Sequence, residues 1–227
     1  MSPNLHNSIY HFRNLLRVFC VVLNTCMDIF NQLKEIVLPH LSANKRIGVS
    51  LSGGFDSAVL LWCCCKIAQQ ENLDCEFRAF TVKRGDNGEE HSHNIVNHVS
   101  SHFGISIQHS FVGRPELPHY KQAWSGVVHA LKISDVVFIG DTNVPECLQG
   151  NSAPRRYDVE LPSCIQPMLY WNKDVVVQLA IDLELYDIMK LSHTCTESHD
   201  ARCNKCWQCG ERAWAFDQCN YTDPGKL

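Results

Sequence analysis

The 227-residue sequence has little of what marks several large classes of protein. Charged residues make up only 19% of it, the formal net charge is −4, and neither half contains a long block of Lys and Arg. Non-specific nucleic-acid binding depends on clustered positive charge, so we expect no direct nucleic-acid binding. The sequence has only 12 Gly and 9 Pro, and 45% of its residues are hydrophobic. This composition excludes a fibrous or disordered chain and allows a packed core.

Long hydrophobic runs are also missing. The apolar N-terminal stretch 15–23 contains Arg17 and is far shorter than the roughly 20 residues that a membrane span requires. We therefore predict a packed helix there and no membrane association. The thirteen cysteines are an odd number and no secretory signal precedes them, which favours a reducing, cytoplasmic location over a disulfide-linked secreted protein.

Strand-like runs alternate with helical patterns through most of the chain. Apolar residues from Ile29 to Val37 recur at helical spacing, and Pro39 is expected to end that helix. Further helices are predicted at 58–70, 91–103, 122–131 and 172–185, and strands at 46–51, 75–82, 105–112 and 135–140. This alternation predicts an α/β fold, a parallel sheet with helices on both faces that binds ligands at the carboxyl ends of its strands.

The same patterns divide the chain into three parts. We assign an N-terminal helical segment to residues 1–44, a nucleotide-binding α/β core to 45–142 and a C-terminal subregion with a cysteine site to 143–227, and we expect this last part to include a helical tail. Met27 opens a clean amphipathic pattern, so an alternative start there, with residues 1–26 as an over-extension, stays open.

The motif that points most directly to chemistry follows the first predicted strand and reads Ser52-Gly53-Gly54-Phe55-Asp56-Ser57. Adjacent glycines let backbone amides approach an anion, the hydroxyls of Ser52 and Ser57 can donate to phosphate oxygens, and the following helix points its positive end at the site. Asp56 would repel phosphate unless a cation lay between them, which makes it a candidate Mg²⁺ ligand. The Walker pattern and the Gly-x-Gly-x-x-Gly fingerprint are both absent, which excludes those two nucleotide-binding classes.

A second motif lies near the C-terminus, where four cysteines are spaced as Cys, seven residues, Cys-x-x-Cys-x-x-Cys. Four thiolates at this spacing can surround one tetrahedral Zn²⁺, and a closed four-sulfur site is structural rather than catalytic. The predicted ligands are Cys195, Cys203, Cys206 and Cys209. An iron–sulfur cluster, a redox Cys-x-x-Cys pair and replacement of one thiolate by His193 or His199 remain as alternatives.

Both motifs resemble those of a known family. The loop matches Ser-Gly-Gly-x-Asp-Ser, the PP-loop pattern of the N-type ATP pyrophosphatases, at all five specified positions. Three further segments accompany the loop: the cysteine array, Arg-Ala-Trp-Ala-Phe at 212–216, and a segment at 166–173 that resembles the family's Pro-Leu segment followed by a lysine. Together they resemble the QueC (7-cyano-7-deazaguanine synthase) family. The resemblance spans residues 45–218, and residues 83–122 depart from the family's pattern.

The resemblance implies an ATP-dependent ligase. Such an enzyme adenylates the carboxylate of 7-carboxy-7-deazaguanine, admits ammonia to form the amide, and activates the amide again for dehydration to the nitrile, for queuosine or deazaguanine modification of nucleic acids. The expected cofactors are ATP, Mg²⁺ and Zn²⁺. The implied partners are the small-molecule acid, or an analogue of it, and ammonia, and a homodimer stays open.

The expected site residues fall into groups beside the four cysteines. The catalytic candidates are Asp56, Ser57 and Lys173. The substrate candidates are Asp141 and Asn143, which stand where the family has a Gly and polar residues beside the substrate. The nucleotide-binding candidates are Leu51, Ser52, Gly53, Gly54, Phe55, Asp56, Ser57 and Gly140. For Lys173 a solvated lysine at a helix start is the alternative, and for Asp141 a loop carboxylate that caps a turn.

Two other functions compete with the ligase. A PP-loop enzyme that thiolates tRNA would need a sulfur-carrying cysteine near the loop, for which Cys147 and Cys164 are candidates. A nucleotide-binding interaction module, in a defence or phage setting, would keep the loop without this activity and would use the cysteine tail to dock a partner.

Overall fold

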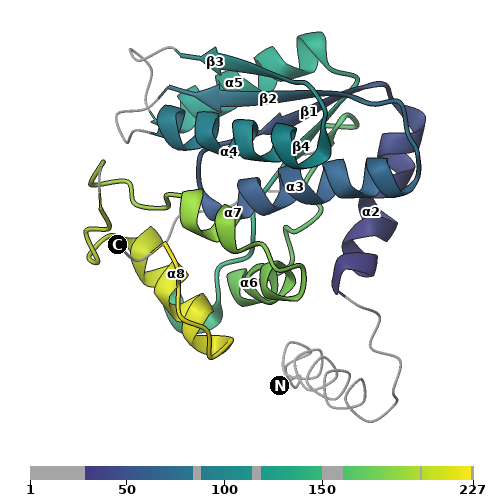
Figure 1. Cartoon of the computed structure of the whole chain (residues 1–227). Helices are drawn as coiled ribbons and strands as arrows, with labels where there is room; N and C mark the ends of the chain where they lie inside the picture. The colour runs from purple at the N-terminus through teal and green to yellow at the C-terminus, as the bar shows by residue number, and fades with distance from the viewer. Residues whose placement is uncertain (1–28, 84–87, 114–118, 150–160, 200, 226–227) are drawn as a thin grey trace, which may run out of the picture.

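The computed structural model describes residues 29–83, 88–113, 119–149, 161–199 and 201–225 (Figure 1). The packed helix predicted at 15–23 and the alternative start at Met27 lie outside these residues. Within the described part of the chain, no helix has both the length and the apolar character needed to cross a membrane.

Five parallel strands form one sheet, in the order β3-β2-β1-β4-β5. The strands are β1 (Arg46–Ser50), β2 (Glu76–Val82), β3 (Ile107–Val112), β4 (Val136–Ile139) and β5 (Cys164–Ile165). From β1 the chain moves outward to β3 and then crosses to β4 on the other side of β1. The strand order therefore reverses between β1 and β4, the place where open α/β sheets bind ligands at the carboxyl ends of the strands.

Helices cover both faces of this sheet, as the sequence predicts (Figure 1). On one face lie α3 (Phe55–Gln70) and α4 (Gly88–Phe103), with α2 (Ile29–Ala43) packed against α3. The other face is covered by α5 (His119–Ile133), which contacts β1, β2, β3 and β4. The central residues of β1 and β4 are buried because both faces are covered, which explains their continuous apolar runs.

The helix α2 differs from the sequence prediction at its C-terminal end. It continues through Pro39 to Ala43 instead of ending at the proline. Proline removes one backbone hydrogen bond, but Pro39 lies on the exposed side of the helix while Val37 and Leu41 on its other side are fully buried. The burial of Val37 and Leu41, which precede and follow the proline in sequence, thus outweighs the local penalty. Asn44 closes the helix by donating to the carbonyl of His40 (2.8 Å).

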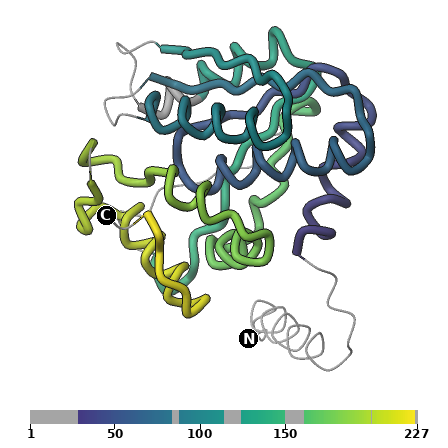
Figure 2. The backbone as a smooth tube through the Cα atoms, in the orientation of Figure 1, coloured from purple at the N-terminus to yellow at the C-terminus, as the bar shows by residue number. Residues whose placement is uncertain are grey.

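The C-terminal subregion packs on the α3 side of the sheet. It contains the short 3-10 helix η1 (Glu146–Leu148), α6 (Lys173–Asp182), α7 (Tyr186–Leu191) and α8 (Trp207–Gln218). Both α6 and α7 contact α3, and α8 packs on α6, so segments more than a hundred residues apart in sequence lie side by side (Figure 2). This packing brings the first residue of α6 to the first turn of α3.

Candidate active site

The Ser-Gly-Gly loop joins the carboxyl end of β1 to the first turn of α3. Gly53 has φ of +81°, and a Cβ there would lie 2.6 Å from the carbonyl oxygen of Gly88 and 3.2 Å from Cβ of His91. A side chain at this position would therefore meet both backbone strain and a clash. The glycine is required by the shape of the turn, which is the kind of turn that lets backbone amides approach a phosphate.

Two serine hydroxyls hold the loop in shape. Ser52 Oγ and Ser57 Oγ lie 3.1 Å apart, Ser57 Oγ donates to the carbonyl of Gly54 (3.2 Å), and the Gly54 amide donates to Ser52 Oγ (3.2 Å). Both hydroxyls thus lie at the N-terminus of α3, whose unpaired amides and dipole favour an anion. The donor set of this loop fits a pyrophosphate group.

Gly140 follows β4 and touches the same helix start. A Cβ on Gly140 would lie 2.7 Å from Cα and 2.8 Å from the backbone nitrogen of Ser57. Both neighbours are backbone atoms, so they cannot turn aside as a flexible side chain would. The structure thus places Gly140 directly against the loop, at the reversal of strand order between β1 and β4.

Lys173 is buried against the loop, so the alternative of a solvated lysine is wrong. Its side chain is 2% exposed, and its Nζ lies 3.0 Å from Asp56 Oδ2 and 2.5 Å from Glu211 Oε2. Sequence reasoning missed Glu211, which lies on α8 with a fully buried side chain. The only sequence signal is its place between Cys209 and Arg212, because a pair separated by 38 residues leaves no local pattern.

Arg212, the next residue on α8, ties the C-terminal segment beneath the loop. Its fully buried guanidinium donates to both carboxylate oxygens of Asp223 (2.8 and 2.9 Å) and to the carbonyls of Ser192 and Met189. Burial raises the pKa of Asp223, but hydrogen bonds from Arg212 and Arg202 outweigh this effect and lower it. These hydrogen bonds tie α8 to Asp223 and to the C-terminal end of α7, which fixes the position of α8.

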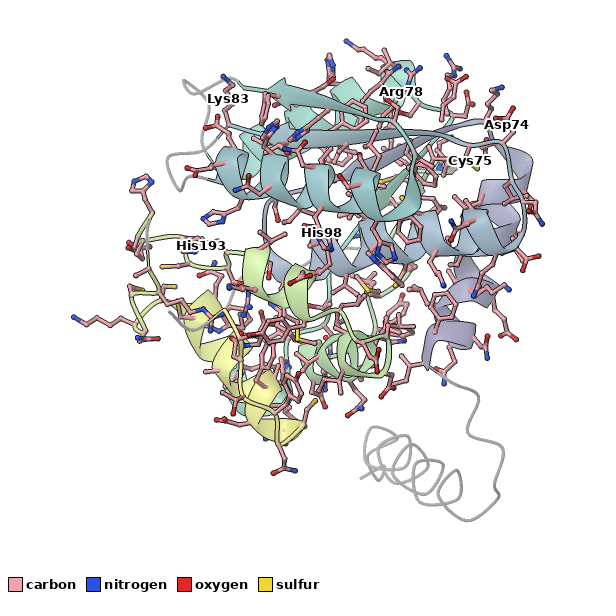
Figure 3. The ribbon with its side chains drawn as sticks, viewed as in Figure 1. Asp74, Cys75, Arg78, Lys83, His98 and His193 are labelled. Atoms are coloured by element: carbon pink, nitrogen blue, oxygen red, sulfur yellow. The ribbon has the colours of Figure 1, made fainter. Side chains whose placement is uncertain are left out.

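His193 connects that segment to the loop directly. Its backbone amide donates to the carbonyl of Gly53 (2.9 Å), and its ring stacks on His91 with centroids 4.5 Å apart and planes 8° apart. Figure 3 shows His193 on the same side of the molecule as Lys83, the residue that follows β2, and opposite Asp74 at the other end of the sheet. The candidate site is therefore at the carboxyl edge of the sheet.

The substrate candidates after β4 are held by the segment that leads into α6. Gln166 Nε2 donates to Asp141 Oδ2 (3.0 Å), and Asn143 Nδ2 donates to Asn172 Oδ1 (2.9 Å). Asn143 also donates its backbone amide to the carbonyl of Trp171 (2.7 Å). These contacts join both residues to the segment that ends at Asn172, the residue before Lys173.

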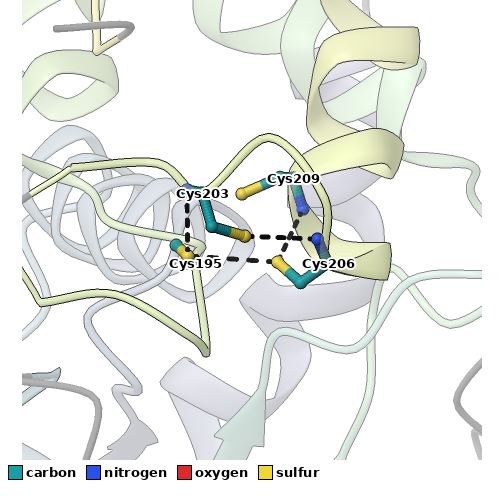
Figure 4. Close-up of side chains that lie close together, drawn as sticks. All are labelled: Cys195, Cys203, Cys206 and Cys209. Carbon is teal, nitrogen blue, oxygen red and sulfur yellow. Dashed lines mark hydrogen bonds between the residues drawn. The ribbon is translucent and has the colours of Figure 1, made fainter.

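The four predicted cysteines come together as one group (Figure 4). All four Sγ atoms lie within 4.8 Å of one another, and those of Cys195 and Cys206 are 4.0 Å apart. A tetrahedral ion with Zn–S bonds of about 2.3 Å needs sulfurs about 3.8 Å apart, so the group could hold a metal ion. The group of possible ligands contains neither His193 nor His199: His193 Nε2 pairs with the carbonyl of Ser198 (2.8 Å), and His199 is exposed.

Backbone amides favour the thiolate form in this group. The amides of Lys205 (3.4 Å) and Cys206 (3.2 Å) donate to Cys203 Sγ, which lowers the pKa of that thiol to about 6. The thiol of Cys206 is the N-cap of α8 and accepts from the amide of Cys209 (3.4 Å). Burial raises the pKa of Cys209 to about 12, a cost that a bound cation would offset.

A pocket of about 720 Å³ opens beside the cysteines. It is lined by Leu148, Thr196, Glu197, Lys205, Cys206, Trp207, Gln208, Gly210 and Glu211. The indole of Trp207 donates to the carbonyl of Leu148 (3.4 Å), which joins the η1 segment to α8. Because Glu211 lines the pocket and also contacts Lys173, only two side-chain contacts separate the pocket from Asp56 of the loop.

Comparison with known proteins places this loop in a family. Residues 29–161, well over half of the chain, match the model of the asparagine synthase family. The chain belongs to the asparagine synthase family. This is a family of ATP-using PP-loop enzymes, whose loop binds ATP with Mg²⁺, and the Ser52–Ser57 loop lies inside the matched range. No curated protein matches the sequence.

Several solved structures are similar in fold to this member of the asparagine synthase family. The U34-tRNA thiolase NcsA from Methanococcus maripaludis, with its [4Fe-4S] cluster, is 17% identical over 85% of this chain and 70% of its own (TM-score 0.48). FMN adenylyltransferase from Candida glabrata is 18% identical over 70% of this chain and 56% of its own (TM-score 0.46). NAD⁺ synthetase from Burkholderia pseudomallei is 14% identical over 69% of this chain and 66% of its own (TM-score 0.43). The chain thus spans less than two thirds of the latter two proteins.

Proposed function

We propose that the protein is an ATP-dependent ligase that activates a carboxylate by adenylation, of the 7-cyano-7-deazaguanine synthase type. The supporting observation is the buried contact of Lys173 with Asp56 and Glu211, which joins the loop, α6 and α8 at one point. In the proposed reaction a carboxylate oxygen of the acid attacks the α-phosphorus of ATP, and pyrophosphate leaves. Catalysis then consists largely of stabilising the charge on the departing group.

The residues around the loop have the chemistry for that task. Ser52, Ser57 and the amides of the loop would donate to the phosphate oxygens, and Lys173 would offset the negative charge of the leaving pyrophosphate. Asp56 would hold Mg²⁺, which supplies further charge neutralisation when bound. A side-chain nucleophile is not required, because the acid attacks ATP directly.

The pocket beside α8 suits a planar acid as the second substrate. Trp207 offers an aromatic surface, and Thr196, Gln208 and Glu197 offer hydrogen-bonding groups for a purine-like edge. Asp141 and Asn143 remain proposed contacts of the acid. The volume of about 720 Å³ lies within the range of small-molecule sites and leaves room for ammonia to enter.

We propose a single Zn²⁺ in the cysteine site. In a four-iron cluster each cysteine binds a different iron, so the sulfurs stand farther apart than around one ion. Separations within 4.8 Å favour the single ion. Measurement of zinc and iron in the purified protein tests this, and stoichiometric iron with acid-labile sulfide would refute it.

The ligase is tested by incubating the folded, metal-replete protein with ATP, Mg²⁺, ammonia and 7-carboxy-7-deazaguanine, followed by mass spectrometry. The nitrile should form together with AMP and pyrophosphate. Asp56→Ala and Lys173→Met should lose turnover when the folded proteins are compared, whereas Lys190→Met, which changes an exposed lysine on α7, should retain it. A folded protein that binds ATP but forms no nitrile refutes this substrate and leaves the PP-loop class intact.

One observation keeps tRNA thiolation as a second candidate. Cys147 is exposed on η1, next to the pocket residue Leu148, whereas Cys164 is buried and its pKa is raised to about 11 by burial and by Asp141. A sulfur carrier must be accessible and reactive, so Cys147 is the better candidate. Sulfur incorporation into tRNA that disappears in Cys147→Ala would favour this function over the ligase.

A further inference from the structure

Lys173 lies between two carboxylates that differ in distance and in burial. Its Nζ is 2.5 Å from Glu211 Oε2 and 3.0 Å from Asp56 Oδ2. The Glu211 side chain is fully buried, while that of Asp56 is 15% exposed. Glu211 is thus the closer partner on the inner side of the ammonium, and Asp56 is the partner nearer to solvent.

The ions around this point are balanced. Lys173, Arg202 and Arg212 are paired with Asp56, Glu211 and Asp223, three cations with three carboxylates. A buried ammonium needs a compensating charge. If Glu211 lost its charge, Lys173 would depend on Asp56 for that compensation and would draw it inward.

The carboxylate of Asp56 is also the proposed ligand of Mg²⁺. Asp56 lies in the first turn of α3, in the PP-loop that handles ATP with Mg²⁺ in this family, and carboxylate oxygens are the ligands that Mg²⁺ prefers. The ammonium of Lys173 and a Mg²⁺ ion therefore compete for the same group. The stronger the pull of Lys173 on Asp56, the more Mg²⁺ the site requires.

Glu211 itself is held in place by the C-terminal structure. It follows Cys209 by two residues on α8, whose N-cap is Cys206, and its neighbour Arg212 is fixed by Asp223 and by the carbonyls of Ser192 and Met189. The carboxylate therefore cannot follow Lys173 if the lysine moves toward Asp56. Its place is set by the cysteine site and the Arg212 network.

From these contacts we propose that Glu211 is a positioning residue: it holds Lys173 on the inner side of the site and so leaves Asp56 available to Mg²⁺. The inference rests on the proposed use of Mg²⁺ and ATP at this loop and adds a role to α8 beyond closing the tail. It assigns to the cysteine site an indirect effect on the metal requirement of the nucleotide site.

The test measures ATP binding by the full chain as a function of Mg²⁺ concentration, with neither acid nor ammonia present. In Glu211→Gln the Mg²⁺ concentration at half-saturation should rise roughly tenfold, a coupling typical of two ligands that share one group. Asp217→Asn, which removes an exposed carboxylate from the same helix, should leave the midpoint unchanged. An unchanged midpoint in Glu211→Gln would overturn the proposal.

A second background separates positioning from a general structural role. If Glu211 acts through Lys173, Glu211→Gln should cause no further shift in a Lys173→Met protein. A shift of equal size in both backgrounds would refute the proposal. If Glu211→Gln does not fold, Glu211→Asp replaces it, with a smaller shift that again disappears in the Lys173→Met background.

The outcome is independent of the substrate. Because the assay contains only protein, ATP and Mg²⁺, failure to form the nitrile would leave the role of Glu211 standing, and an unchanged midpoint would leave the ligase standing. Failure of the folded protein to bind ATP would overturn both.

Discussion

Replacing Gly140 by alanine tests whether the contact between β4 and α3 shapes the nucleotide site. The added Cβ would stand 2.7 Å from Ser57 Cα, whereas ordinary contact begins at 3.4 Å, so the backbones must separate by about 0.7 Å, the difference between the two. Overpacking of this kind costs about 1–3 kcal/mol of stability. The shift falls on the residue whose hydroxyl holds the loop closed.

ATP binding should weaken together with stability. Misplacing a group by about 1 Å can cost about 100-fold, so ATP affinity should fall at least about tenfold in Gly140→Ala. Urea unfolding and ATP titration on the same preparation measure both effects. Gly210→Ala is the matched control, because a Cβ there meets nothing within 4 Å and the change in a helix should be neutral or stabilising by up to about 1 kcal/mol. Wild-type stability and affinity in Gly140→Ala would refute the argument.

Two further predictions concern other parts of the molecule. Cys206→Ser should prevent metal binding and lower the Tm, since a structural zinc is worth on the order of 10 kcal/mol to the segment it closes. Metal analysis and calorimetry measure the two effects. Full metal content together with an unchanged Tm would contradict the prediction. Asp135→Asn should cost stability at pH 7 but not at pH 2. Hydrogen bonds from Arg46 lower the pKa of Asp135 to about 2 in the folded protein. Its contribution to stability is therefore present above the pKa of the unfolded chain, about 3.9, and is lost as pH falls through about 2. An equal difference in stability between the variant and the wild type at both pH values, measured by urea unfolding, would refute this link between pKa and stability.

The fold could be predicted because its signals are local. Each core strand and helix shows its own period, and a parallel sheet covered on both faces follows from their alternation. The end of α2 could not be predicted in this way, because burial of Val37 and Leu41 against the rest of the protein overrides the local effect of Pro39. The short helix α7 is not predicted as a separate element, and the predicted helical tail, which contains α8, buries charged residues on the side that a helical period would mark as apolar.

The candidate site likewise contains residues that local motifs predict and residues that depend on long-range packing. The Ser-Gly-Gly loop and the four cysteines are contiguous or closely spaced motifs, so their residue types alone predict them. Whether Lys173 is solvated or buried depends on Asp56 and Glu211, which are far from it in sequence and reach it only through the packing of α6 on α3 and α8. The sequence contains no local trace of such a contact.

The pairing of Lys173 with Glu211 also sets an order for the assembly of the protein as it is made. The loop at residues 52–57 leaves the ribosome about 150 residues before Glu211, which at about 5–20 residues per second is a delay of roughly 8–30 s. During that interval α6 has been synthesised, but burying its lysine against the loop would leave the cation without its nearest carboxylate. The docking of α6 is therefore coupled to the docking of α8, and the nucleotide site can be completed only after α8 has been translated.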